Sequence, residues 1–235
     1  MSKPIALILG AGKNIGASST KAFQAKGYRV AQAARSLQPQ DSTDNDLLLK
    51  CDLSKPELIS SVFADVRKSW GEPSVVIYNA SAAHFTSPDD AFNVSPEDFA
   101  TDYAINVTSA YLSIKEAVAS FRTLPSEAAK AFFYTGNCLN TGPLDGKLLG
   151  MMTSGVGKSG AAFMIQTAAN SYGAQGMKFY YVDERTPEGK PAISPYVDGP
   201  GHADFFIQLA EGTAGKVPAL ATFVTGKGYT SFPKL

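Results

Sequence analysis

The chain has 235 residues, of which 44 % are hydrophobic, and its 21 Lys and Arg balance 21 Asp and Glu. This apolar content suffices for a buried core and excludes general disorder, and zero net charge argues against a nucleic-acid or membrane-surface partner. The length predicts one domain over residues 1–235. Apolar runs such as 5–9 are far shorter than the ~20 residues of a bilayer-spanning helix, so a cytoplasmic protein is expected.

Short apolar runs alternate with helical stretches, which is typical of βαβ units. Strands are expected at residues 5–9, 29–33, 47–49, 75–78, 131–134, 178–182 and 222–225. Helices are expected at about 15–26, 58–70, 95–121, 154–172 and 203–210, and Ser54 and Glu57 have the spacing of a capping box before the second. The predicted fold is α/β, a Rossmann-type, doubly wound parallel sheet of about seven strands with helices on both faces.

The cysteines and histidines do not predict a site of their own. Cys51 and Cys138 cannot form a disulfide framework and lack metal-ligand spacing, so we expect buried free thiols. His84 and His202 are far apart in sequence and lack the neighbours of a zinc site or a Ser-His-Asp hydrolase. No metal site is therefore expected.

A glycine-rich loop follows the first expected strand. Glycines there let the backbone turn tightly and approach a pyrophosphate over the N-terminus of the next helix. Ile15 stands where the common G-x-G-x-x-G pattern has its third glycine, so a simple turn is the competing interpretation. The loop residues expected to contact a dinucleotide are Gly10, Gly12, Lys13, Asn14, Ile15 and Gly16.

The end of the second expected strand indicates which dinucleotide binds. An NAD site usually has a carboxylate there, whereas this chain has Arg35 and Ser36 after two alanines. A guanidinium can hold the 2′-phosphate of NADP, and Lys13 can add a second cation. We predict NADP(H) in preference to NAD(H); the alternative is that Arg35 and Lys13 are ordinary solvated charges.

These residues resemble the short-chain dehydrogenase/reductase family, and the resemblance covers the chain from Ile5 to about Phe232. Asn14 stands where the family usually has its middle glycine, and residues 78–81 resemble its Asn-Ala-Gly segment. Asn106 matches the family's helix asparagine, which implies a water relay. The resemblance implies further cofactor contacts at Asp52, Leu53, Asn79, Ala80, Ser81 and Lys158.

The catalytic segment departs from the family pattern. Its Tyr-x-x-x-Lys aligns with Ser154 and Lys158, so the lysine is kept and the tyrosine is replaced. Met151 and Met152 exclude the longer spacing of the family's enoyl reductases, and residues 135–137 contain no serine. A serine hydroxyl is a far weaker acid than tyrosine, so Tyr196, in the segment resembling the substrate loop, is the outside candidate for the proton donor. The predicted catalytic residues are Asn106, Ser154, Lys158 and Tyr196.

Two functions from different classes fit this pattern. The first is an NADP(H)-binding oxidoreductase that acts on a small organic substrate through an altered proton-transfer site. The second is a redox-inactive, cofactor-binding pseudoenzyme that acts as a sensor or interaction protein. Non-redox chemistry in the same pocket stays open. The family resemblance also implies a homodimer or homotetramer, paired through the helices matching 95–121 and 154–172.

Overall fold

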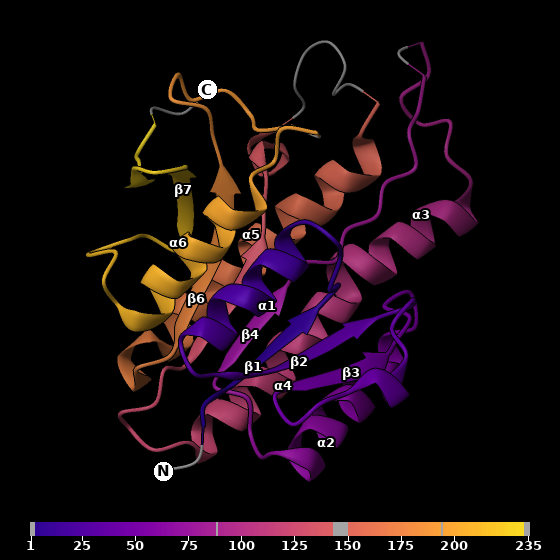
Figure 1. Ribbon diagram of the computed structural model, residues 1–235. Helices are drawn as coiled ribbons and strands as arrows, with labels where there is room; N and C mark the ends of the chain where they lie inside the picture. The colour runs from indigo at the N-terminus through magenta and orange to yellow at the C-terminus, as the bar shows by residue number, and fades with distance from the viewer. Residues whose placement is uncertain (1–2, 88, 143–149, 194, 233–235) are drawn as a thin grey trace.

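The structure, a computed structural model, describes residues 3–87, 89–142, 150–193 and 195–232. Within these ranges eight strands form one sheet in the order β3-β2-β1-β4-β5-β6-β7-β8, parallel except where β7 meets β8 (Figure 1). The strands are β1 (Ile5–Leu9), β2 (Arg29–Ala34), β3 (Asp46–Lys50), β4 (Val75–Tyr78), β5 (Ala131–Thr135), β6 (Lys178–Glu184), β7 (Leu220–Val224) and β8 (Gly228–Tyr229). The helices are α1 (Ile15–Ala25), α2 (Ile59–Ser69), α3 (Pro96–Tyr103), α4 (Ser109–Thr123), α5 (Met152–Tyr172) and α6 (Gly199–Glu211).

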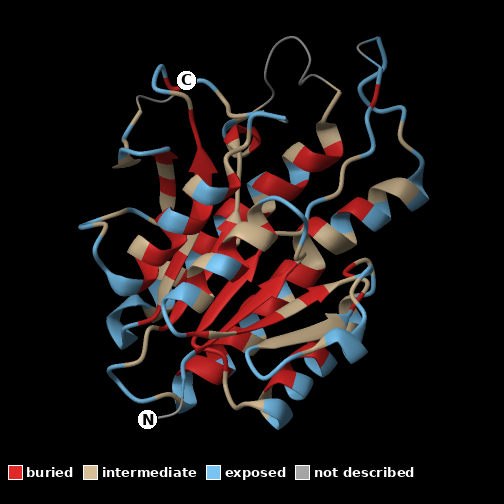
Figure 2. Cartoon of the chain, viewed as in Figure 1, coloured by how far each residue is buried: buried red, intermediate tan, exposed pale blue. Residues whose placement is uncertain are grey.

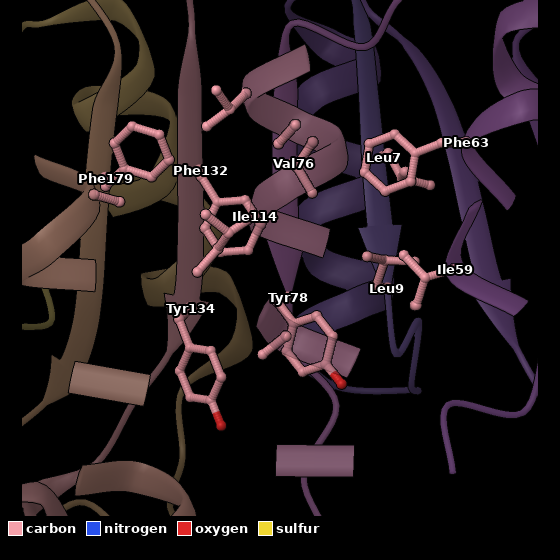
Figure 3. Packing of buried hydrophobic residues seen from close by; sticks show 14 of the residues in the cluster. Leu7, Leu9, Ile59, Phe63, Val76, Tyr78, Ile114, Phe132, Tyr134 and Phe179 are labelled. Atoms are coloured by element: carbon pink, nitrogen blue, oxygen red, sulfur yellow. The ribbon is translucent and has the colours of Figure 1, made fainter. Parts of the chain in front are cut away.

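Helices cover both faces of this sheet, as the doubly wound prediction requires. Alternate residues of β1 point to opposite faces: Leu7 packs in a cluster with α2, α4 and α5, whereas Ile8 packs in a cluster with α1 and α6. The central strands β1 and β4 are therefore buried on both faces (Figure 2). Figure 3 shows Tyr78 and Tyr134 side by side in the cluster that contains Leu7, with their hydroxyls toward the same end. The two rings are stacked, and their centroids are 5.6 Å apart.

Three local expectations need correction. Ser54 does not cap α2, because its hydroxyl donates to Asp52 Oδ1 and a 3₁₀ turn at Pro56–Leu58 precedes the helix. The helix expected over 95–121 begins as expected, with Ser95 accepting from the Asp98 amide, but a π-helical segment, η3 (Ala104–Thr108), interrupts it. Strand β8 was not expected, since two residues carry no readable periodicity.

None of the helices in the described ranges combines the length and the apolar character needed to cross a membrane. Two regions at the carboxyl ends of the parallel strands are hollow, and ligands of open α/β sheets bind at this edge. One hollow lies beside the loop after β1, and the other lies beyond β5 and β6.

Candidate functional site

The glycine loop between β1 and α1 brings two backbone segments into close contact. Gly10 has φ +87°, and a Cβ placed on it would lie 2.5 Å from the backbone nitrogen of Ala80. The side-chain amide of Asn79 donates to the Gly10 carbonyl at 2.9 Å. A Cβ on Gly16 would lie 2.8 Å from the backbone of Ala11, whereas one on Gly12 would meet nothing within 4 Å. Gly10 and Gly16 are thus needed for packing, and Gly12 faces open space.

A crevice of about 420 Å³ lies beside this loop. Of the residues expected to bind a dinucleotide, it is lined by Gly10, Gly12, Arg35, Ser36, Asp52, Leu53, Asn79, Ala80 and Ser81. The other loop residues lie elsewhere. Lys13 is exposed, Gly16 is buried, and Ile15 faces the second hollow. The Asn14 amide donates to the carbonyl of Val197 at 2.9 Å, so it joins the loop to the segment before α6.

The charges in this crevice are a carboxylate and a guanidinium. The Ser54 backbone N–H and hydroxyl both donate to Asp52 Oδ1, which lowers the pKa of that carboxyl, with Arg35 and Lys55 adding to the effect. Arg35 is exposed at the end of β2 and makes no ion pair with any residue that the structure describes. An open backbone cradle with an unengaged cation therefore fits a phosphorylated dinucleotide.

The second hollow is a cavity of about 440 Å³, and Asn79 and Ser81 line it as well as the crevice. One part of its wall is apolar and comes from loops: Phe85, Leu139, Met151, Pro191, Ala192 and Ile193. The other part carries polar and titratable groups: Asn137, Cys138, Lys158, Asp183, Glu184 and His202. The two hollows therefore adjoin, with one part that fits a phosphorylated dinucleotide and one part that can hold an organic substrate.

Lys158 is the predicted catalytic residue that this cavity contains. Its ammonium donates to the Thr135 carbonyl at 2.9 Å and lies 4.8 Å from the centre of the Tyr134 ring. Burial lowers the pKa of Lys158 to about 8, and Asp183 opposes that shift. The ammonium form is thus retained at neutral pH but gives up its proton more readily than an ordinary lysine.

Asn106 and Ser154 lie near Lys158 but not on the described lining of the cavity. The Asn106 side chain is occupied by the backbone of Ala82, accepting from its N–H at 3.0 Å and donating to its carbonyl at 2.7 Å. Its own carbonyl accepts from the Tyr134 hydroxyl at 3.1 Å. Ser154 is 2 % exposed inside the packing of α5. Both residues are thus placed to position other parts of the site.

Neither Tyr196, the predicted alternative acid, nor the buried tyrosines near Lys158 offers a free hydroxyl to this cavity. Tyr196 is 80 % exposed and lines a neighbouring hollow with Arg185 and Thr186 instead. The Tyr181 hydroxyl donates to the Asn137 carbonyl and accepts from the Asn137 N–H. Burial raises the pKa of both Tyr134 and Tyr181, which makes them poorer proton donors.

The charged residues at the end of β6 were not predicted from the sequence. Asp183 and Arg185 form a buried ion pair, with Asp183 Oδ2 accepting from two guanidinium nitrogens at 2.6 and 2.7 Å. Glu184 accepts from the Asp198 N–H at 2.9 Å. Burial lowers the pKa of His202 to about 4, so this side chain is neutral at pH 7. No motif marks these residues, although their place at a parallel strand's carboxyl end is a usable signal.

His84 lies outside this charged group, and the two cysteines are thiols of low reactivity. The His84 ring contacts Asp98 and Asp102 on α3. Cys51 and Cys138 are buried free thiols, as predicted, and burial raises the pKa of each to about 11. In the described ranges, no cluster of three or more His, Cys, Asp or Glu side chains could hold a metal ion.

The chain is similar to several known proteins over nearly its whole length. A family model described as enoyl-(acyl carrier protein) reductase matches residues 10–184. The short chain dehydrogenase/reductase dmxR12 of Cryptosporiopsis sp. (strain 8999) is 43 % identical over 245 residues, which covers 99 % of this chain and 96 % of that protein.

Solved structures with low identity share the fold. One is a metagenomic short-chain oxidoreductase in complex with NADP, 18 % identical with a TM-score of 0.78, covering 95 % of this chain and 98 % of that one. Another is 3-ketoacyl-(acyl-carrier-protein) reductase from Brucella melitensis complexed with NADH, 16 % identical with a TM-score of 0.78, covering 96 % of this chain and 98 % of that one.

Proposed function

Because the chain belongs to the short-chain dehydrogenase/reductase family of oxidoreductases, we propose that it binds NADP(H) and reduces or oxidises a small organic substrate. The observation that carries the proposal is the crevice beside the glycine loop, with Arg35 where an NAD site usually has a carboxylate. The structurally similar proteins include one with NADP and one with NADH, so the preference rests on Arg35. When bound, the dinucleotide would supply or accept a hydride.

Different residues of the crevice would contact different parts of the cofactor. Gly10 would let the loop turn against Ala80, and Gly12, which faces open space, would leave room for the pyrophosphate over the N-terminus of α1. Arg35 and Ser36 would hold the 2′-phosphate, and Lys13 at the exposed side of the loop would add positive charge. Asp52 and Leu53 would contact the adenine. Asn79, Ala80, Ser81 and Lys158 would hold the nicotinamide half.

The cavity beyond β5 and β6 would receive the substrate. Its loop-derived wall of Phe85, Leu139, Met151 and Ile193 suits an apolar body. Its polar wall can orient an oxygen or nitrogen atom. With Ser154 in the position of the family tyrosine, proton transfer in this site uses a different group, which is the altered proton-transfer site we propose.

Calorimetric titration of NADPH and NADH tests the cofactor preference. We expect tighter binding of NADPH, and Arg35→Ala should weaken NADPH binding by about 10- to 100-fold while leaving NADH binding near its original value. Lys55→Ala is the matched control, since Lys55 is another exposed cation near Asp52 but does not line the crevice. Equal affinities for the two dinucleotides in the native protein would overturn the preference.

A redox-inactive, cofactor-binding pseudoenzyme is the second candidate, and the burial of Ser154 off the cavity favours it. Steady-state NADPH oxidation against carbonyls, imines and enones separates the two functions. Turnover with any of these classes supports the oxidoreductase. Tight NADPH binding without turnover across the panel supports the pseudoenzyme.

We also propose that α4 and α5 pair with a second copy of the chain in a homodimer or homotetramer. Tyr111, Val156 and Phe163 are exposed on these helices at 53, 41 and 72 %. Exposed large apolar groups on neighbouring helices suit a self-complementary contact. Phe163→Glu should convert the oligomer to a monomer in sedimentation velocity; a native protein that sediments as a monomer contradicts this.

A cytoplasmic location stays a prediction.

A further inference from the structure

An ammonium and a carboxylate face the same cavity from different elements without pairing with each other. Lys158 on α5 and Asp183 at the end of β6 are each 3 % exposed, and both line the cavity beyond β5 and β6. Among the described residues, Asp183 has one ion-pair partner within 4 Å, which is Arg185 and not Lys158. The two groups are therefore available to a substrate atom or a water molecule in that cavity without being bound to each other.

Each of the two groups is anchored on one side. An ammonium has three N–H donors, and Lys158 gives one to the Thr135 carbonyl, with the Tyr134 ring covering another flank. Arg185 binds only Oδ2 of Asp183, through its Nε and Nη2. Asp183 Oδ1 receives no hydrogen bond from the part of the chain that the structure describes. One N–H and one carboxylate oxygen are left for the cavity.

The other titratable groups around Lys158 are engaged or inert. Glu184 on β6 accepts from the Asp198 N–H and the Thr225 hydroxyl. His202 on α6 is neutral at pH 7, since burial lowers its pKa to about 4. Burial raises the pKa of Cys138, in the 3₁₀ turn Cys138–Thr141, to about 11. Tyr134 and Tyr181 donate to the Asn106 and Asn137 carbonyls, and Arg185 binds Asp183.

We propose that Lys158 is the proton donor of the reduction and that Asp183 is the counter-ion that keeps it charged. This inference rests on the proposed reductase function. In the reduction of a carbonyl, an N–H bond of Lys158 breaks, its electron pair stays on Nζ, and an O–H bond forms at the substrate oxygen. The hydride for the carbonyl carbon would come from the reduced nicotinamide dinucleotide, and water entering the cavity returns a proton to Nζ.

The electrostatics support this role. Burial lowers the pKa of Lys158 to about 8, closer to neutral pH than the value of about 10 of an ordinary tyrosine. Removing the Asp183 charge removes an interaction that favours the ammonium, so the pKa of Lys158 must fall further. Burial raises the pKa of Asp183, and Arg185 and Lys158 oppose that shift.

The test measures Lys158 itself before any turnover. Lysine labelled with ¹³C and ¹⁵N reports the titration of the Lys158 Nζ by NMR in native protein, Asp183→Asn and Glu184→Gln. We expect Asp183→Asn to shift this titration to lower pH and Glu184→Gln, the matched carboxylate in the same cavity, to leave it in place. In reduction assays, Asp183→Asn should lose about tenfold in kcat at pH 7 and move the alkaline fall of kcat to lower pH.

If Asp183→Asn does not fold because the Arg185 charge is left unpaired, the double variant Asp183→Asn/Arg185→Gln replaces it in the titration, since it removes both charges of the buried pair. An unchanged Lys158 titration in the folded variant overturns the proposal, and so does an alkaline limb that stays at the native pH. Failure of the native protein to bind NADPH or to turn over would instead refute the proposed function, because the Lys158 titration is read in the absence of cofactor.

Discussion

The two hollows at the carboxyl edge of the sheet are built by different means. The crevice beside β1, β2 and β4 is lined mainly by glycine, alanine and other small residues, and of its two charged residues Arg35 is exposed and Asp52 is half-buried. The cavity beyond β5 and β6 carries Lys158 and Asp183, both nearly fully buried. Backbone recognition needs only a tight turn, and so it leaves a short motif in the sequence. Buried charges need partners from distant segments, and so they leave none.

The largest effect is expected where the crevice depends on backbone contact. Gly10→Ala places a Cβ 2.5 Å from the Ala80 nitrogen at φ +87°, so it should destabilise the fold by about 4 kcal/mol in urea unfolding. Gly12→Ala is the control, because its Cβ meets nothing within 4 Å. It should change stability by less than about 0.5 kcal/mol while weakening NADPH binding. Equal stability losses in the two variants would contradict a backbone-built crevice.

An intermediate effect is expected from a buried ring in the cavity. Burial lowers the pKa of His202 from 6.5 to about 4, so the unfolded chain takes up the proton first as the pH falls. The contribution of His202 to stability is thus complete above pH 6.5 and decreases by about 3 kcal/mol as the pH falls to 4. Urea unfolding at pH 7, 5 and 4 measures it.

The comparison for this second prediction uses a variant of His202. His202→Asn, which keeps a side-chain donor, should lose less stability than the native protein between pH 7 and 4. The same acid slope in His202→Asn and the native protein would show that His202 is not buried in its neutral form.

The smallest effect is expected where a side chain holds a loop of the cavity. The Tyr181 hydroxyl makes two hydrogen bonds to the backbone of Asn137, so Tyr181→Phe should cost about 1 to 2 kcal/mol in urea unfolding. It should also speed hydrogen exchange of the Asn137 amide. Tyr180→Phe is matched, because the Tyr180 hydroxyl bonds to no described residue. If Tyr181→Phe lowers the free energy of unfolding by no more than Tyr180→Phe does, the Tyr181 hydroxyl does not hold the loop at Asn137.

The sequence predicted the fold more fully than the site. The family and the Rossmann-type sheet are confirmed, because apolar runs such as Ile5–Leu9 and the glycine loop are local signals. The pairing of β8 depends on a contact with β7 rather than on its own two residues. The sequence does not predict the pair of Asp183 and Arg185, because the burial of these residues depends on elements far along the chain. The place of Tyr196 in the sequence makes it a candidate proton donor, whereas its 80 % exposure follows only from the fold.

The hydrogen bond from Asn14 to Val197 joins residues 183 positions apart. A chain leaving the ribosome therefore displays the glycine loop long before the segment that closes against it has been translated. A fragment ending before Val197 would keep the glycine loop without the segment that Asn14 contacts. The contact between the glycine loop and the segment before α6 is for this reason formed late in biosynthesis, by the last fifth of the polypeptide.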